Sequence, residues 1–245
     1  MSIPAGAVTA PQRVRELTGD PEPQCVWIND IGGMTFRATN RQGSGLYVKW
    51  GPLNEETGTR AEAERLRWAA RWIRVPQVLD QGEDGQHEWL VTRAIDADSA
   101  VHPRWIAEPE TAVRAIGEGL RALHDALPVA ECPWEWTVPT RIENAARRGI
   151  LLPERFRDAP DIDRLVVCHA DACCPNTLIG ADGRWLAHVD LGSMGVGDRW
   201  ADIAVASMST EWNYGPGWED ALIAAYGVEP DRERLAFYRD LWNAT

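Results

Sequence analysis

The spacing of apolar positions changes once along this chain. In the first hundred residues, apolar side chains fall in short runs rich in β-branched and aromatic residues, which is typical of strands. In the remainder they recur at steps of three and four, as on the buried face of a helix. The pattern therefore predicts an α+β protein with a strand-rich first part and a helical second part.

Four short runs in the first part are predicted strands, and glycine turns punctuate them. They cover residues 25–28, 34–39, 46–50 and 88–93. A helix is predicted over residues 59–73, ended by Pro76, with one apolar face made of Leu66, Ala69, Ala70 and Ile73. Residues 22–94 should therefore form a small, mainly antiparallel sheet with one helix packed on it.

The second part is dominated by helical spacing. A helix over residues 110–127 has Pro109 at its start, Pro128 beyond its end and an apolar face of Val113, Ile116, Leu120, Leu123 and Leu127. Three further helices are predicted over 200–211, 217–226 and 230–242. The polar stretch near 95–99 predicts the boundary, with one lobe over residues 1–95 and another over 96–245.

Charge and composition narrow the class of partner. The chain has 25 Lys and Arg against 37 Asp and Glu, a net charge of −12, and no basic run, so we expect no nucleic-acid partner. A field of this sign attracts cations, although many proteins are acidic for solubility alone. The first ten residues lack a secretory signal, and no apolar run is long enough to span a membrane, so we expect a cytoplasmic protein.

The five cysteines are odd in number, and two of them are adjacent. Cys168, His169, Cys173 and Cys174 place four soft ligands within seven residues, but not with the paired spacing that wraps a zinc ion. We interpret these thiols as buried and inert in a reducing compartment.

Two carboxylates and an amide follow strand-like runs in the second part. Asp171 is followed five residues later by Asn176 and fourteen residues after that by Asp190. A hairpin that turns at Asp182-Gly183 would bring Asn176 and Asp190 side by side, and their oxygens suit Mg²⁺. Phosphoryl transfer from ATP needs such a set, with Asp171 as the base that receives the proton of the attacking hydroxyl.

Lys49 interrupts an apolar strand. Taken alone, such a lysine is more often a device of an edge strand that blocks edge-to-edge pairing. With Glu62 on the following helix it would form the pair that neutralises the α- and β-phosphates of ATP. Glu64 lies on another face of that helix and is the alternative partner.

Further nucleotide-binding candidates lie at the ends of strands. Gly32, Gly33 and Thr35 belong to a glycine turn whose backbone N–H groups could approach phosphate, although a simple hairpin turn is the better explanation of this segment taken alone. The other candidates end the strand 88–93: they are Thr92, Arg93 and Ala94.

Glycines and charges follow Asp190. Gly192, Gly195 and Gly197 predict a loop that bends sharply beside the metal. Asp198, Arg199 and Asp202 are interpreted as an ion-pair and capping cluster at the start of the next helix.

With these residues in view, the chain resembles the aminoglycoside phosphotransferase family, and within it the 3′-phosphotransferases, over residues 25–242. The resemblance is carried by the segments VCHADACCPNTL, VDLGSMGVGDRWADIA and LYVK. It implies a two-lobed fold like that of eukaryotic protein kinases and transfer of the γ-phosphoryl group of ATP to a sugar hydroxyl. It assigns the base to Asp171, the metal ligands to Asn176 and Asp190, and phosphate binding to Lys49 with Glu62.

The sequence departs from the family pattern in several places. The glycine that usually precedes the catalytic aspartate is Ala170, which should be tolerated if its backbone avoids positive φ. Arginines of well-known members are replaced by Ser193 and Met208, the acidic-aromatic C-terminus is absent, and the segment between Cys132 and Leu165 is short.

The acceptor is therefore expected to be an aminoglycoside, a cationic drug whose phosphorylation confers antibiotic resistance. A cationic drug needs an acidic pocket, for which the candidates are Glu211, Glu143 and Asp240, with Trp212 as a lining residue. Alternatives are a kinase of the same fold for a macrolide, choline-like or sugar substrate, and a nucleotide-binding pseudokinase. We expect a monomer or a weak dimer.

Overall fold

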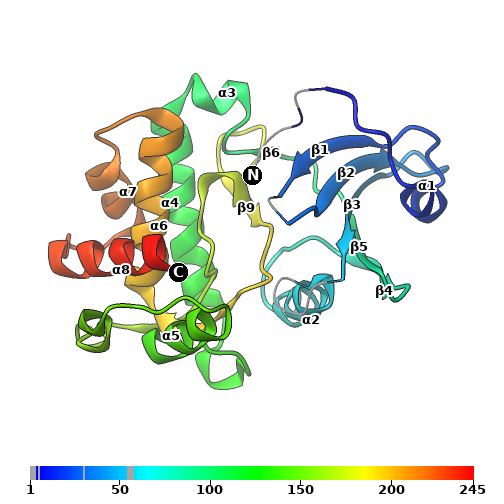
Figure 1. The fold of residues 1–245 in the computed structure, drawn as a ribbon. Coiled ribbons are helices and arrows are strands. Elements are labelled where there is room, and N and C mark those ends of the chain that lie inside the picture. Colours follow the sequence, from blue (N-terminus) through cyan, green and yellow to red (C-terminus); the bar gives the residue numbers. More distant parts are fainter. Residues whose placement is uncertain (1–3, 5, 30, 54–57) are drawn as a thin grey trace. The chain divides into compact units, whose positions relative to one another are not determined.

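The computed structural model describes residues 4, 6–29, 31–53 and 58–245. The chain divides into two compact units: Met1–Arg71 with Val75–Asp96, and Trp72–Arg74 with Ala97–Thr245. Figure 1 shows strands concentrated in the first unit and helices in the second, which confirms the α+β class expected from the sequence. Within the described residues, none of the helices has both the length and the apolar character needed to cross a bilayer.

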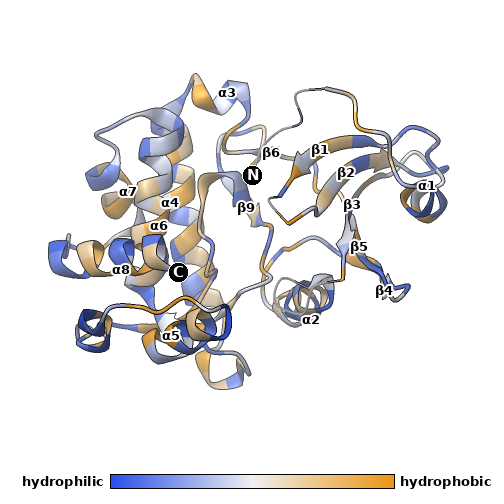
Figure 2. Cartoon of the chain, in the orientation of Figure 1, coloured by the Kyte–Doolittle hydropathy of each residue, from blue (hydrophilic) through white to orange (hydrophobic). Residues whose placement is uncertain are grey.

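The first unit is built on a five-stranded antiparallel sheet in the order β1-β2-β3-β5-β4. Its strands are β1 (Gln24–Ile28), β2 (Met34–Thr39), β3 (Gly45–Pro52), β4 (Val78–Glu83) and β5 (His87–Arg93), and its helices are α1 (Gln12–Thr18) and α2 (Thr59–Ala69). The four predicted strands are all present. The sequence pattern missed α1 and β4. Strand β4 lies at the sheet edge and is mostly hydrophilic in Figure 2, so it lacks the apolar signal of a buried strand.

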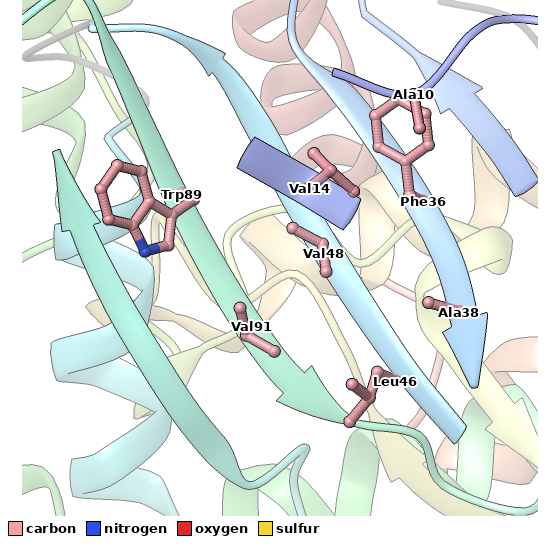
Figure 3. Packing of buried hydrophobic residues seen from close by; sticks show 8 residues of the cluster. All are labelled: Ala10, Val14, Phe36, Ala38, Leu46, Val48, Trp89 and Val91. Atoms are coloured by element: carbon pink, nitrogen blue, oxygen red, sulfur yellow. The ribbon is translucent and has the colours of Figure 1, made fainter. Parts of the chain in front are cut away.

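The two helices of this unit contact different strands. Helix α1 contacts β2 and β3, whereas α2 contacts β4 and β5. Figure 3 shows apolar side chains of the sheet packed around Val14 of α1. The cluster consists of Ala10, Val14, Phe36, Ala38, Leu46, Val48, Trp89 and Val91.

Helix α2 is shorter than its apolar spacing predicts. It ends at Ala69, so the expectation that it runs on to Ile73 is wrong, and Ala70 is exposed rather than on the buried face. Leu66 and Ala69 are buried as expected. The early end agrees with Pro76, whose ring disfavours helical backbone at the preceding residue and would clash with a carbonyl one turn earlier.

The second unit packs helices around two short sheets. Its helices are α3 (Pro103–Ile106), α4 (Pro109–Ala126), α5 (Val138–Arg147), α6 (Arg199–Tyr214), α7 (Glu219–Tyr226) and α8 (Arg232–Ala244), with 3₁₀ turns at Val129–Glu131, Glu154–Arg157 and Cys174–Asn176. The four helices predicted from spacing are therefore present as α4 and α6 to α8. All five predicted apolar positions of α4 are buried. Helix α6 is buried on every side from Trp200 to Thr210 because α4, α7 and α8 all pack on it.

Two sheets of this unit carry the candidate chemistry. One pairs β7 (Leu165–Cys168) with β10 (Gly195–Asp198), and the other has the order β6 (Asp98–Ser99), β8 (Thr177–Ile179), β9 (Trp185–His188). Strands β8 and β9 form the predicted hairpin, with Gly183 at φ 77° in its turn.

The sharply bent loop expected after Asp190 is present only at Gly192, in a turn that the hydrogen bond from the Met194 N–H to the Leu191 oxygen closes at 3.1 Å. Gly195 and Gly197 lie instead in strand β10, and neither they nor Gly192 have positive φ. A Cβ on Gly195 would lie 2.7 Å from the backbone carbon of Glu135, and one on Gly197 would lie 2.8 Å from the Trp136 oxygen. These two glycines therefore allow the segment 134–136 to approach the strand closely.

Candidate active site

Lys49 lies in the middle of β3 and faces helix α2. It is opposite Thr35 of β2 and Leu90 of β5, and residues opposite each other in an antiparallel ladder share a face. Leu90 is buried on the face that α2 covers, whereas Val48 points into the cluster of Figure 3. The pleat thus places the Lys49 and Thr35 side chains on the α2 side of the sheet.

The structure pairs Lys49 with Glu62 and not with Glu64. The Lys49 Nζ atom lies 2.6 Å from Glu62 Oε2, and the Glu62 side chain is only 9% exposed. Glu64 is exposed and pairs with Arg60, one turn away on the same helix. The geometry thus resolves the choice between the two glutamates, and it fixes the ammonium at a defined point on the sheet.

The glycine turn joins β1 to β2. Asn29 Oδ1 accepts hydrogen bonds from the backbone N–H of Gly33 (2.6 Å) and of Ile31 (3.2 Å). A Cβ on Gly51 of β3 would come within 2.8 Å of the Gly33 Cα atom, so the turn lies close to that strand. Since Asn29 uses the Gly33 N–H, phosphate binding by this turn would need a rearrangement, and it stays a prediction.

The three candidates at the end of β5 differ in their surroundings. Thr92 is buried and shares the face of Lys49, since it lies two residues after Leu90. Arg93 is exposed and bonded to Gln77, and the Ala94 N–H donates to the Gly45 oxygen at 3.0 Å. Thr92 therefore has the position that best suits contact with a ligand near Lys49.

Asp171 belongs to the catalytic segment, by which we mean residues 169–176, between β7 and β8. The buried carboxylate of Asp202 on α6 accepts the backbone N–H of His169 at 2.5 Å and that of Ala170 at 2.9 Å. His169 Nδ1 then accepts the Asp171 N–H at 3.3 Å, and its Nε2 bonds the Val189 oxygen at 3.0 Å. His169 thus braces the segment and ties it to the strand that leads to Asp190.

The condition under which alanine at position 170 was expected to be tolerated, a backbone that avoids positive φ, is not met. Its φ is 70°, a region in which Cβ crowds the following carbonyl and which L-residues other than glycine seldom enter. The two N–H bonds to Asp202 hold the backbone in this conformation. Asp190 also has positive φ, 62°, which aspartate tolerates better than alanine does.

Asn176 and Asp190 come together at the end of the β8–β9 hairpin. The Val189 N–H donates to the backbone oxygen of Asn176 at 3.0 Å, so Asp190 comes directly after the residue that pairs with Asn176. Asn176 Nδ2 donates to both the backbone oxygen of Asp171 (2.9 Å) and its Oδ2 atom (3.1 Å). The hairpin thus brings the two residues to the same end, as expected, and the approach of their side chains to a shared cation stays a prediction.

This donor set fits a hard divalent cation. Because Asp171 takes both hydrogens of the Asn176 amide, the Oδ1 atom of that amide is the side left for a metal. The Asp190 residue is exposed, as a carboxylate that meets a ligand should be. Carboxylate and amide oxygens are ligands that Mg²⁺ accepts, and it commonly takes only one or two carboxylates together with phosphate oxygens. Within the described residues, no group of three His, Cys, Asp or Glu side chains forms a separate metal site.

The thiols beside Asp171 favour the protonated form. Burial, reinforced by the Asp171 charge, raises the pKa of Cys173 far above its usual value, and burial raises the pKa of Cys174 to about 12. Burial likewise raises the pKa of the Cys168 thiol. Protonated thiols are poor nucleophiles and poor metal ligands, which agrees with the interpretation that they are inert.

Helix α6 brings its last turn to the catalytic segment. Ser209 Oγ accepts the Cys174 N–H at 2.8 Å. At 100° per residue, Trp212 lies about 60° around the helix from Ser209, whereas Glu211 lies about 160° away. Trp212 therefore lies on the same side of the helix as Ser209, and its side chain is 60% exposed. Glu211 is exposed on the far side of the same turn.

The other acidic candidates lie elsewhere in the second unit. Glu143 is exposed on α5. Asp240, on α8, forms an exposed ion pair with Arg155 at 3.5 Å, so its charge is partly offset. The described contacts link neither residue to the catalytic segment, and their role in binding a drug stays a prediction.

The capping and ion pairing expected at the start of α6 are present for Asp198 and Arg199. Asp198 caps the helix by accepting the Trp200 N–H and also accepts the Asp163 N–H at 3.0 Å, and Arg199 pairs with Asp163 at 2.6 Å. Asp202 is instead bonded to His124 of α4, whose other ring nitrogen lies 2.9 Å from the Tyr226 hydroxyl. Sequence reasoning missed His124 and Tyr226. A signal was present, because His124 follows Leu120 by one helical turn and so lies on the apolar face of α4.

Comparisons with known proteins agree with this geometry. A model of the phosphotransferase enzyme family matches residues 32–238, a range that includes Lys49, Asp171, Asn176 and Asp190. An aminoglycoside 3′-phosphotransferase of Streptomyces fradiae is 33% identical, over 92% of this chain and 88% of the relative. A crystal structure of an aminoglycoside-3′-phosphotransferase of type VIII has a TM-score of 0.74 and 29% identity, over 95% of this chain and 97% of that one. The structure of an aminoglycoside phosphotransferase of Streptomyces rimosus in complex with ADP and streptomycin has a TM-score of 0.71 and 26% identity, over 93% of this chain and 94% of that one.

Proposed function

Because this chain belongs to the phosphotransferase enzyme family, we propose that it transfers the γ-phosphoryl group of ATP to the 3′-hydroxyl of an aminoglycoside. The resemblance noted from the sequence and the kinase-like α+β fold are confirmed by the relatives and by the solved structures. The observation that carries the proposal is the arrangement of the catalytic segment, in which Asp171 lies beside Asn176 and Asp190 follows at the end of the same hairpin.

Each of these side chains has a role in the proposed reaction. Asp171 receives the hydrogen bond of the acceptor hydroxyl and orients that oxygen toward the γ-phosphorus. As the new P–O bond forms, the bond from the γ-phosphorus to the oxygen of the β-phosphate breaks, ADP leaves, and Asp171 takes the hydroxyl proton. The Asn176 hydrogen bond to Asp171 Oδ2 holds the carboxylate in one orientation, which leaves the other oxygen for the acceptor. In the first unit, Lys49 binds the α- and β-phosphates, and Glu62 keeps its ammonium in place.

Asn176 and Asp190 would hold the divalent cation. When bound, Mg²⁺ neutralises phosphate charge and orients the phosphates. Lys49 adds a further positive charge through its ammonium. We therefore include ATP and Mg²⁺ as the cofactors of the proposed reaction.

The acceptor follows from charge and from the named relatives. A net charge of −12 favours the approach of a polycationic drug, and several relatives carry the name aminoglycoside 3′-phosphotransferase. Transfer of phosphate adds negative charge to such a drug, so the proposed physiological role is resistance in the cytoplasm, where both ATP and the drug's target occur. Glu211, Glu143 and Asp240 stay the candidate anionic contacts.

The test is a panel of acceptors with ATP and Mg²⁺, read by product mass. We expect a gain of one phosphate on kanamycin and none on the analogue that lacks the 3′-hydroxyl. Equal rates on both would contradict the 3′ position, and a product with streptomycin alone would move the acceptor toward that of the Streptomyces rimosus enzyme. Turnover of a macrolide or choline-like alcohol alone would favour another small-alcohol kinase. ATP binding without turnover on any acceptor would favour a pseudokinase.

A further inference from the structure

A line of buried hydrogen bonds connects helix α7 to the catalytic segment. The Tyr226 hydroxyl lies 2.9 Å from His124 Nδ1, and His124 Nε2 lies 3.0 Å from Asp202 Oδ2. Asp202 in turn accepts the backbone N–H groups of His169 and Ala170. The last residue of α7 is thus three hydrogen bonds from the backbone that precedes Asp171.

We infer that Tyr226, acting through His124, is a positioning residue that keeps Asp202 in place beneath the catalytic segment. The inference concerns the reaction of the proposed function and rests on it for its kinetic test. It does not assign Tyr226 any contact with a substrate.

The polarity of the line explains why the hydroxyl matters. The Asp202 carboxylate can only accept, so the hydrogen of a neutral His124 ring belongs on Nε2. Nδ1 is then an acceptor, and the Tyr226 O–H is the donor that faces it. Without that hydroxyl, a ring hydrogen on Nδ1 would no longer be disfavoured. The ring would then turn a lone pair of Nε2 toward the carboxylate.

Burial makes the line sensitive to the loss of any member. The side chains of His124 and Asp202 are 0% and 1% exposed, and Tyr226 is buried. Water therefore has no easy access to replace a lost partner, and an unpaired buried polar group is costly. Burial alone would raise the pKa of Asp202, but the hydrogen bonds from His124 and from the Ala170 backbone hold the pKa below its usual value, so the carboxylate stays ionised.

The packing of α7 on α4 brings the tyrosine to the histidine. A Cβ on Gly117 of α4 would lie 2.7 Å from the Leu222 oxygen and 2.9 Å from the Tyr226 nitrogen, so only glycine allows this approach. Two turns further along α4, His124 meets the Tyr226 ring at a centroid distance of 5.6 Å. Arg121 of α4 donates to the Tyr226 backbone oxygen at 3.4 Å.

The test uses Tyr226→Phe, which removes one oxygen and leaves the ring. Loss of one buried hydrogen bond in the line should lower kcat about threefold to tenfold, with the KM values for ATP and acceptor little changed. The amide proton signals of His169 and Ala170, which are bonded to a carboxylate, should shift in the NMR spectrum. Tyr238→Phe is the matched control, because Tyr238 is equally buried and no hydrogen bond is described for its hydroxyl.

A second variant separates positioning from a general loss of stability. In a His124→Gln background, the added Tyr226→Phe change should have little further effect, because the line is already broken. Unchanged kcat and unchanged amide signals in Tyr226→Phe would overturn the inference, as would equal effects of Tyr238→Phe or additive effects in the double variant. The NMR arm needs no acceptor. If the parent enzyme phosphorylates no aminoglycoside, the proposed function fails while this inference is still tested.

Discussion

Lys49 and Asp171 are held in place by different kinds of structure. Lys49 lies in a regular strand, and its partner Glu62 comes from a regular helix. Asp171 follows a residue with positive φ, and the two backbone N–H groups before it donate to the buried Asp202 carboxylate. In the regular elements, the placement of Lys49 follows from strand and helix geometry together with its ion pair. A site built on irregular backbone depends on side chains far away in the sequence, which accept its N–H groups.

The largest loss should follow from removal of the Asp190 carboxylate. Asp190→Ala should reduce phosphoryl transfer below detection at ordinary Mg²⁺ concentrations, because the cation that offsets phosphate charge loses its anionic ligand. Asn176→Ala should lose less and recover in part at high Mg²⁺, because it removes one neutral oxygen. The measurement is a Mg²⁺ titration of initial rate for both variants.

Asp190→Asn separates charge from backbone strain at this position. Asparagine accepts positive φ as readily as aspartate does, so this variant keeps the conformation and removes only the charge. It should be as inactive as Asp190→Ala. A Mg²⁺ response like that of the parent in either variant would contradict the assignment of the hairpin as the metal site.

The next effect concerns the base. Asp171→Asn keeps the shape of the side chain and the Asn176 contact but removes the proton acceptor, so kcat should fall about 10²–10⁴-fold. Nucleotide affinity, measured by titration calorimetry, should stay close to that of the parent. Near-normal turnover would contradict the assignment of Asp171 as the base. The hydrogen bonds that Asp202 accepts from the catalytic segment would then have no catalytic purpose.

The sharpest test of the Lys49 arrangement is the pair of glutamates on α2. Glu62→Gln should raise the KM for ATP about tenfold, because the Lys49 ammonium loses a partly buried anionic partner. Glu64→Gln is the matched control, and it should change little, since that side chain is exposed and pairs with Arg60. Equal effects of the two variants would show that Glu62 does not specifically orient Lys49.

The same contrast explains what the sequence could predict. Regular elements with strong spacing, such as α4 and the strands around Lys49, were found together with the residues they carry. Strand β10 was not found, because its glycines indicated a loop, whereas they serve the approach of segment 134–136. The role of Asp202 was missed because it lies more than thirty residues from the N–H groups that it accepts. Only the packing of α6 beside the segment reveals that contact.

The smallest predicted effect bears on the strained backbone itself. Ala170 has φ 70°, and this conformation costs an alanine about 1–2 kcal/mol of conformational free energy that glycine does not lose. Glycine also adds about 0.4–1 kcal/mol of chain entropy to the unfolded state. It removes the buried methyl group of Ala170 as well, which costs about 0.8 kcal/mol. These two costs nearly cancel the relief of strain, so Ala170→Gly should change the free energy of unfolding by less than about 0.5 kcal/mol. For a chain of this size the melting temperature should shift by less than about 2 °C, as measured by calorimetry.

Ala172→Gly is the control, because Ala172 is buried in the same segment and has no positive φ. There glycine brings only the entropy cost and the loss of a buried methyl group, so the melting temperature should fall. A clear loss of stability at position 172 and almost none at position 170 would assign the difference to backbone conformation at position 170, because both substitutions remove a buried methyl group. If Ala170→Gly lowers the melting temperature as much as Ala172→Gly does, then the hydrogen bonds to Asp202 hold this backbone without measurable strain. The segment beside Asp171 would then be no more costly to form than the regular strand that carries Lys49.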